Sequence, residues 1–163
     1  MTEVQMKRKI LLAVAIVIFI SIISIIVITS NHQRLSNKIT DYCDKNTQIS
    51  SEIKLSDFTD FEWDNVIIYR YPVTAKEISE FAGIDYEKAL DLQSGMIFVK
   101  NGKVVYEEKF KTEFESMSSF IIYPYADINS EFKMNRFSVD DAVFKSERVR
   151  YDNENRYMLK PLY

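Results

Sequence analysis

The sequence predicts an α+β protein with an N-terminal transmembrane helix, a helical stalk and an antiparallel sheet of about five or six strands, with one or two short helices on a face. Three observations predict it: an uncharged apolar run near the N-terminus, apolar residues at heptad spacing after it, and later β-branched and aromatic runs separated by turn residues. The expected segments are a cytoplasmic tail (1–9), a transmembrane helix (10–29), a stalk (30–54) and an extracytoplasmic α+β domain (55–163).

The apolar run "ILLAVAIVIFISIISIIVIT" at residues 10–29 contains no charged side chain. As a helix with a rise of about 1.5 Å per residue it would span roughly 30 Å, the thickness of the hydrocarbon core of a bilayer. The alternative is a cleaved signal peptide, which has an apolar core of about 7–15 residues and a small-residue cleavage site. The longer, β-branched run favours an uncleaved signal-anchor. The basic residues at 7–9 place the N-terminus in the cytoplasm of a single-pass cell-membrane protein.

Charge and composition exclude several classes of function. The first thirty residues hold three Lys or Arg and one acid, so the remaining chain keeps 18 basic and 23 acidic residues and a net charge of −5. This acidic balance, without a basic stripe, excludes nucleic acid as a partner. His32 is the only histidine and Cys43 the only cysteine, which excludes Ser/His, Cys/His and zinc sites. We therefore expect no enzyme, cofactor or metal; a carboxylate-based hydrolase is the remaining enzyme alternative.

The stalk is predicted from a short heptad seam. Its apolar and amide residues are spaced alternately by four and three: Leu35, Ile39, Tyr42, Asn46, Ile49 and Ile53. One interpretation is a parallel homodimer whose register is set by Asn46 at an a position. The other is an amphipathic helix whose stripe packs on its own domain. A single cysteine cannot form an internal disulfide, so Cys43 is expected to be a thiol.

The domain opens with a strand and a well-marked helix. The run "NVIIYRYPV" at 65–73 is β-branched and aromatic, as strands are. Thr74 and Glu77 form a capping-box pair, and Gly83 is placed to end the helix. A second short helical turn is expected to follow from Asp85, with Ala89 and Leu90 facing inward.

The remaining segments predict hairpins. In "MIFVKNGKVVYEE" (96–108) the pair Asn101-Gly102 suits a type I′ turn, which would place Val99 opposite Val104 and Phe98 opposite Val105. Both faces of this hairpin are apolar near the turn, so it should lie centrally, covered on both sides. A strand is expected at 118–123, and a C-terminal hairpin with its turn at 152–155.

The acidic stretch "DFTDFEWDNVIIYRYP" (57–72) raises the question of a metal site. In a strand, Asp60, Glu62 and Asp64 would share one face and Trp63 would lie on the other. Three carboxylates can hold Ca²⁺, but the stretch has no tight glycine turn. We interpret it as a solvated acidic edge rather than a calcium site or a partner surface, with Trp63 as a core anchor that bonds its indole N–H nearby.

Aromatic residues supply the candidate binding surface. "YRY" and "YPY" place tyrosines at alternate positions, and Tyr and Arg are enriched in protein interfaces. The alternative is that these rings cover the core at the rim of a sheet. The candidate binding residues are Tyr69, Arg70, Tyr71, Tyr123 and Tyr125.

The segment from Leu55 to Val105, with "LSDFTDFEWDNVIIYRYPVTAKEI" and then "IFVKNGKVV", resembles a known group. These motifs are similar to those of small uncharacterised secreted or membrane-anchored proteins of low-GC Gram-positive bacteria, which carry an F-x-W-D stretch, a P-x-T helix start and a later hairpin. Many of those proteins have "PY" after the strand, whereas Val73 follows Pro72 here. The resemblance covers about a third of the chain. It implies a small extracytoplasmic α+β domain and assigns no catalytic residue or ligand.

These observations predict a membrane-anchored, extracytoplasmic, non-catalytic binding module that engages a protein partner at the cell surface, as an interaction domain or an inhibitor. One alternative is a structural homodimer formed through the stalk, with no ligand. The other is the carboxylate-based hydrolase, which would need two acids about 5–9 Å apart in a deep pocket.

Overall fold

The computed structural model describes residues 34–46, 50–90, 92–111, 120–151 and 154–162, and residues 35–163 belong to one folded unit. Its helices are α2 (Leu35–Lys45) and α3 (Ala75–Ala82), with a short 3-10 helix, η1 (Leu55–Asp57). Its strands are β1 (Ser50–Lys54), β2 (Asn65–Tyr69), β3 (Ser94–Lys100), β4 (Lys103–Phe110), β5 (Phe120–Ile122), β6 (Met134–Ser138), β7 (Val143–Tyr151) and β8 (Glu154–Pro161).

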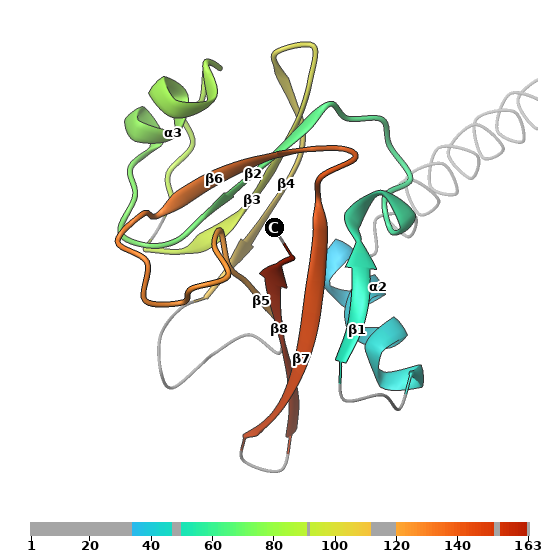
Figure 1. The fold of residues 1–163 in the computed structure, drawn as a ribbon. Coiled ribbons are helices and arrows are strands. Elements are labelled where there is room, and N and C mark those ends of the chain that lie inside the picture. Colours follow the sequence, from blue (N-terminus) through green and yellow to red (C-terminus); the bar gives the residue numbers. More distant parts are fainter. Residues whose placement is uncertain (1–33, 47–49, 91, 112–119, 152–153, 163) are drawn as a thin grey trace, which may run out of the picture. The chain divides into compact units, whose positions relative to one another are not determined.

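The strands form two four-stranded sheets, in the orders β1-β7-β8-β5 and β4-β3-β2-β6 (Figure 1). All pairings are antiparallel except that of β5 with β8, which is parallel. The expected C-terminal hairpin is confirmed as β7 and β8, and the strand expected at 118–123 is confirmed at β5.

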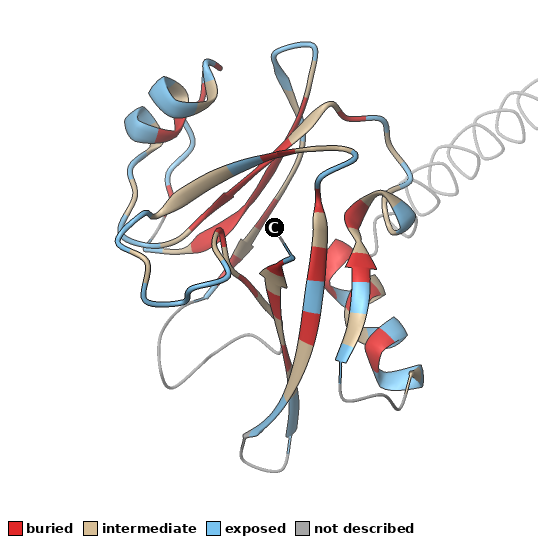
Figure 2. Ribbon diagram, viewed as in Figure 1, coloured by how far each residue is buried: buried red, intermediate tan, exposed pale blue. Residues whose placement is uncertain are grey.

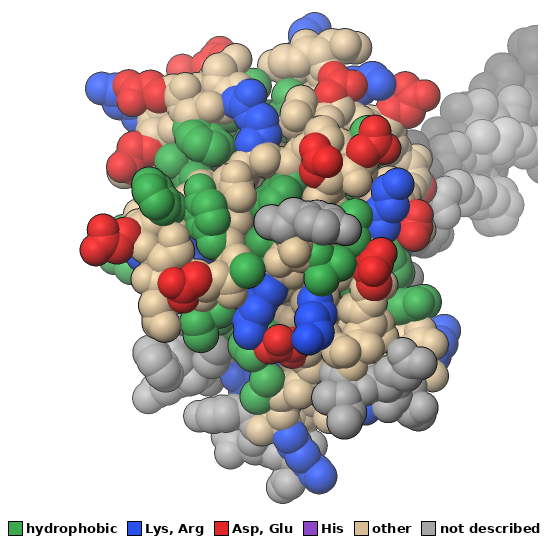
Figure 3. Space-filling view, in the orientation of Figure 1, with side chains coloured by type: hydrophobic (Ala, Val, Ile, Leu, Met, Phe, Trp, Pro, Cys, Tyr) green, Lys and Arg blue, Asp and Glu red, His purple; other side chains and the backbone are tan. Residues whose placement is uncertain are grey.

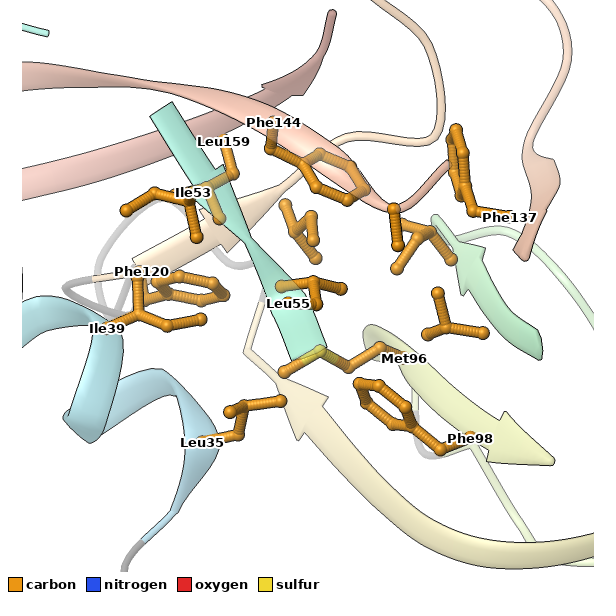
Figure 4. Close-up of a cluster of buried hydrophobic side chains, with 14 of the residues drawn as sticks. Leu35, Ile39, Ile53, Leu55, Met96, Phe98, Phe120, Phe137, Phe144 and Leu159 are labelled. Carbon is orange, nitrogen blue, oxygen red and sulfur yellow. The ribbon is translucent and has the colours of Figure 1, made fainter. Parts of the chain in front are cut away.

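The main core lies between the two sheets. Phe144 and Leu159 reach it from the first sheet, and Met96 and Phe98 from the second (Figure 4). Helix α2 contributes Ile39, which has no exposed surface. The sandwich therefore buries one face of each sheet and uses α2 to close its side.

A second, smaller core covers the other face of the β2–β3 pair. Residues of β2 alternate between the two cores, so Ile68 faces the main core and Ile67 faces the smaller one. Ile78 of α3 packs into the smaller core. Strand β3 is consequently buried along nearly its whole length (Figure 2). The expectation that the 96–108 hairpin lies centrally holds for β3 only, because β4 is an edge strand of its sheet and Lys103 and Val105 on it are exposed.

The capping residues of α3 and the residues of the hairpin turn predicted the local structure correctly. Thr74 and Glu77 form both bonds of a capping box, and Gly83 ends the helix with φ of 66°. Asn101 and Gly102 have φ of 50° and 72°, as a type I′ turn requires.

Two finer expectations were wrong. Val99 does pair with Val104, but a bulge follows, so Phe98 pairs with Tyr106 instead of Val105. Residues 85–90 are irregular instead of helical, and Ala89 is exposed while Leu90 is buried.

The predicted fold class was wrong. The described chain holds two short helices and two four-stranded sheets, in place of a helical stalk and a single sheet. Helix α2 ends at Lys45, and Ser50–Lys54 pairs with β7 as strand β1. The heptad spacing misled because Ile39 belongs to a helix but Ile53 enters the same core from a strand. Of the two interpretations, packing on the chain's own domain is the one observed.

Helix α2 packs on the sheets, and side chains far along the sequence form hydrogen bonds with the free backbone groups at its two ends. At its N-terminus the buried Glu108 carboxylate accepts the Ser36 N–H at 3.2 Å and also the Ser36 hydroxyl. At its C-terminus the Arg148 guanidinium donates to the carbonyl oxygens of Cys43 at 2.9 Å and Asn46 at 3.3 Å. The Glu108 carboxylate also lies at the positive N-terminal end of the helix dipole, and the Arg148 cation lies at its negative C-terminal end, so both charges are favourable there.

The predicted transmembrane helix of a single-pass, signal-anchored protein is absent from the part of the chain that the structure describes. Within the described residues, no helix is long and apolar enough to cross a membrane. The run at 10–29, the cytoplasmic tail at 1–9 and His32 lie outside the described residues.

Candidate binding surface around Arg70

Arg70 follows the last residue of β2 and connects three segments. Its backbone N–H donates to the Lys133 carbonyl at 2.8 Å, which extends the pairing of β2 with β6 by one step. Its guanidinium lies 4.8 Å from the centre of the Tyr123 ring, and Nη1 donates to the Ile128 carbonyl at 2.8 Å. The cation is thus fixed against an aromatic face and uses only part of its five-donor set.

The segment between β5 and β6 presents large apolar side chains beside this cation. The Tyr125 hydroxyl donates to the Met134 carbonyl at 2.9 Å, and its ring centre lies 5.7 Å from that of Phe132. Phe132 is 71% exposed and Ile128 is 40% exposed. We call the set Arg70, Tyr123, Tyr125, Ile128 and Phe132 the aromatic rim.

In the space-filling view, hydrophobic side chains gather on the side of the molecule where the segment from β5 to β6 lies (Figure 3). A phenylalanine with most of its surface in water gains nothing from that exposure, and clustered exposed apolar groups mark interaction sites. The geometry therefore suits contact with another molecule.

A half-open hollow of about 90 Å³ adjoins the aromatic rim. It lies where the end of β4 and the start of β3 approach β5. Its lining residues are Arg70, Ser94, Phe110, Lys111, Ile121, Ile122 and Tyr123. Arg70 and Tyr123 belong to both the hollow and the aromatic rim, so the two features form one continuous surface.

The charged side chains that line the hollow are both cations, Arg70 and Lys111. None of the seven lining residues is acidic, and no ion pair joins Arg70 or Lys111 to an acid among the described residues. Ser94 is 5% exposed, and its Oγ accepts the Tyr71 N–H at 3.1 Å, so its own proton is directed elsewhere. The arrangement can hold an anionic group beside apolar walls.

The sequence-predicted residues are only partly together. Arg70, Tyr123 and Tyr125 lie on the aromatic rim, and Tyr71 is 46% exposed next to Arg70 in the chain. Tyr69 is fully buried in the smaller core instead, and desolvation raises the pKa of its phenol well above its usual range. Because β2 ends at Tyr69, the strand alternation that was expected to pair Tyr69 with Tyr71 does not reach Tyr71.

Sequence reasoning missed two exposed residues of the aromatic rim, Ile128 and Phe132, and five residues that line the hollow: Ser94, Phe110, Lys111, Ile121 and Ile122. Ile128 and Phe132 carried a usable signal, since they are isolated large apolar residues in the polar, turn-rich stretch "YADINSEF". Ser94 and Lys111 carried none, because only the approach of β3 and β4 to β5 brings them to the hollow.

The acidic stretch is paired with lysines. It is irregular over 58–64 and does not form the expected strand. Asp60 pairs with Lys38 at 3.1 Å, and Asp64 pairs with Lys100 at 3.4 Å. In the described part of the chain, no group of three or more His, Cys, Asp or Glu side chains is placed to hold a metal ion.

Trp63 is the core anchor that was predicted. It is 5% exposed, and its Nε1 donates to the Thr59 hydroxyl at 3.0 Å. Its ring meets Phe98 edge to face at 5.0 Å, which ties the acidic stretch to the main core.

Comparison of the chain with models of protein families, with characterised proteins and with solved structures returned no match. The resemblance of residues 55–105 to small extracytoplasmic proteins stays a prediction. The functional argument rests on the geometry above.

Proposed function

We propose that this protein is a non-catalytic binding module that engages another protein at the aromatic rim and the adjoining hollow. The observation that carries the proposal is the exposure of Phe132 and Ile128 beside a guanidinium that is stacked on Tyr123. Interfaces are enriched in aromatic residues and arginine, and their strongest contacts are aromatic and arginine anchors.

The chemistry of the hollow favours binding over catalysis. The carboxylate-based hydrolase needs two acids that flank a substrate, whereas the seven lining residues include none. The stalk-mediated homodimer is not proposed, because α2 packs its apolar stripe into its own domain.

The test is site-specific photo-crosslinking in intact cells with the full chain. A photoreactive amino acid is placed at Phe132 in one variant and at Val105 in a matched control. Val105 is 43% exposed and lies near the start of β4, outside the aromatic rim and the lining of the hollow. We expect one dominant protein adduct from position 132 and none from position 105. The adduct should weaken when Arg70→Gln is added, because the cation that positions Tyr123 is lost.

Equal adduct patterns from positions 132 and 105 would refute the aromatic rim as the binding surface. Refutation would also follow if position 132 gave no adduct while the variant kept the thermal stability of the unmodified protein.

A further inference from the structure

We infer that the hollow binds the free C-terminal carboxylate of a peptide chain whose last residue is apolar. This inference rests on the proposed function, because it names the chemical feature of the protein partner that the surface would recognise. It is argued from the charge of the hollow, its buried hydroxyl, its apolar walls and its size.

The charge of the hollow selects an anion. Arg70 and Lys111 contribute two positive charges, and the seven lining residues contribute no negative one. Arg70 uses one N–H for the Ile128 carbonyl, which leaves other donors of the planar guanidinium for a ligand. A carboxylate matches that planar fork through two parallel hydrogen bonds.

The buried hydroxyl of Ser94 is a second, independent feature that favours a hydrogen-bonding ligand in the hollow. The residue is 5% exposed and lines the hollow, and its hydroxyl already accepts the Tyr71 N–H. Among the described residues no acceptor is placed for its proton, so the hydroxyl can donate to a ligand in the hollow. A buried donor of this kind gains from a partner, because leaving it without an acceptor is costly.

The apolar walls and the small volume of the hollow favour the end of a peptide chain as its occupant. Phe110, Ile121 and Ile122 form apolar walls next to the cations, so the occupant has an apolar group close to its charge. The C-terminal residue of a peptide has this arrangement, since its carboxylate and its side chain share one carbon atom. A volume of about 90 Å³ is well below the roughly 300–1,000 Å³ of pockets that enclose whole ligands. The hollow therefore admits one end of a longer molecule.

The rest of the partner would then cross the aromatic rim. Arg70 lines the hollow and stacks on Tyr123, so a chain that leaves the hollow meets Tyr123 first. Capture of a terminal carboxylate together with neighbouring side-chain contacts is a known mode of peptide recognition.

The experiment follows backbone amide shifts of the ¹⁵N-labelled full chain during titration with N-acetyl-leucine. Three matched ligands accompany it: N-acetyl-leucinamide, which lacks the carboxylate, N-acetyl-aspartic acid 1-amide, which carries its carboxylate on a side chain, and inorganic phosphate. We expect N-acetyl-leucine to shift the amides of Ser94, Phe110 and Ile122. The carboxamide should bind at least roughly tenfold more weakly, because hydrogen bonds to a charged group are lost.

Two lysine variants test the charge. Lys111→Gln should weaken N-acetyl-leucine binding by roughly two- to fivefold, as expected for an exposed charge pair. Lys103→Gln should change nothing, since Lys103 is an exposed lysine at the hairpin turn, away from the lining of the hollow. Both positions are exposed, so both variants keep the fold.

Equal binding of N-acetyl-leucine and its carboxamide would overturn the inference, as would equal binding of phosphate or of the side-chain carboxylate. Absence of any shift with all four ligands would also overturn it. Cross-linking from position 132 distinguishes the carboxylate inference from the proposed binding module. An adduct at position 132 without amide shifts in the hollow would refute the carboxylate inference and support the binding module. If neither the adduct nor the amide shifts are observed, both the carboxylate inference and the binding module are refuted.

Discussion

Replacing Ile39 by alanine tests whether α2 is an integral part of the domain. Ile39 has no exposed surface and packs in the main core. The change removes three carbon atoms, worth about 0.8 kcal/mol each in transfer free energy, or about 2.4 kcal/mol together. The cavity left behind adds to this, and buried Ile→Ala changes cost about 2–5 kcal/mol. We expect the free energy of unfolding to fall by about 3 kcal/mol.

Tyr42→Ala is the matched control on the same heptad seam. Tyr42 is 42% exposed and contacts Phe58 edge to face at 5.3 Å. We expect a loss of about 1 kcal/mol from that ring pair. A stalk would have given Ile39 and Tyr42 equivalent places, whereas the folded domain buries one and exposes the other.

Urea unfolding of the full chain measures both losses. Trp63 is the only tryptophan and is buried, so its fluorescence reports on the main core. With an m value of about 2 kcal/mol per molar urea, the midpoint should fall by about 1.5 M for Ile39→Ala and about 0.5 M for Tyr42→Ala. Equal, small shifts for the two variants would refute the docking of α2.

Three further predictions concern other parts of the fold. Gly95→Ala should destabilise the protein strongly in thermal unfolding, because the new Cβ would lie 2.5 Å from a backbone carbonyl oxygen of β4; Gly102→Ala, with nothing within 4 Å, should cost only about 1 kcal/mol for its positive φ. Cys43 is buried, and desolvation raises the pKa of its thiol, so it should react slowly with a thiol reagent at pH 8 and much faster once the protein is unfolded in urea; equal rates for the folded and unfolded protein would contradict the burial. A hydrogen bond from a hairpin backbone amide lowers the pKa of Asp64 below its ordinary 3.8, so its stabilising contribution is complete above that pH and is lost as pH falls through the lowered folded-state pKa; Asp64→Asn should flatten the pH dependence of the unfolding midpoint in that acid range.

Some features followed from sequence because the groups that determine them lie close together in the chain. The capping box of α3 joins Thr74 to Glu77, three residues apart. The hairpin turn depends on two adjacent residues that accept positive φ. The anchoring of Trp63 needed only a large apolar ring and a hydroxyl four residues away. Patterns of this range are visible in any single sequence.

The candidate surface was only half predictable for the same reason. Arg70 and Tyr123 stood out by residue type, but their stacking depends on where β5 lies relative to β2. Tyr69 was assigned to the surface because strand alternation was extended past the true end of the strand. Lys111 gave no signal at all, since its role depends on the approach of β4 to β5.

The sequence alone therefore determined the capped helix α3, the turn of the β3–β4 hairpin and the buried tryptophan. The tertiary structure decided that α2 lies on the domain and that Ser50–Lys54 is a strand. The reason is distance along the chain: Glu108 reaches Ser36 across 72 residues, and Arg148 reaches Cys43 across 105. The sequence around α2 fits a stalk as well as a docked helix. Only the folded sheets supply the charged groups at its two ends and the apolar surface that its stripe covers.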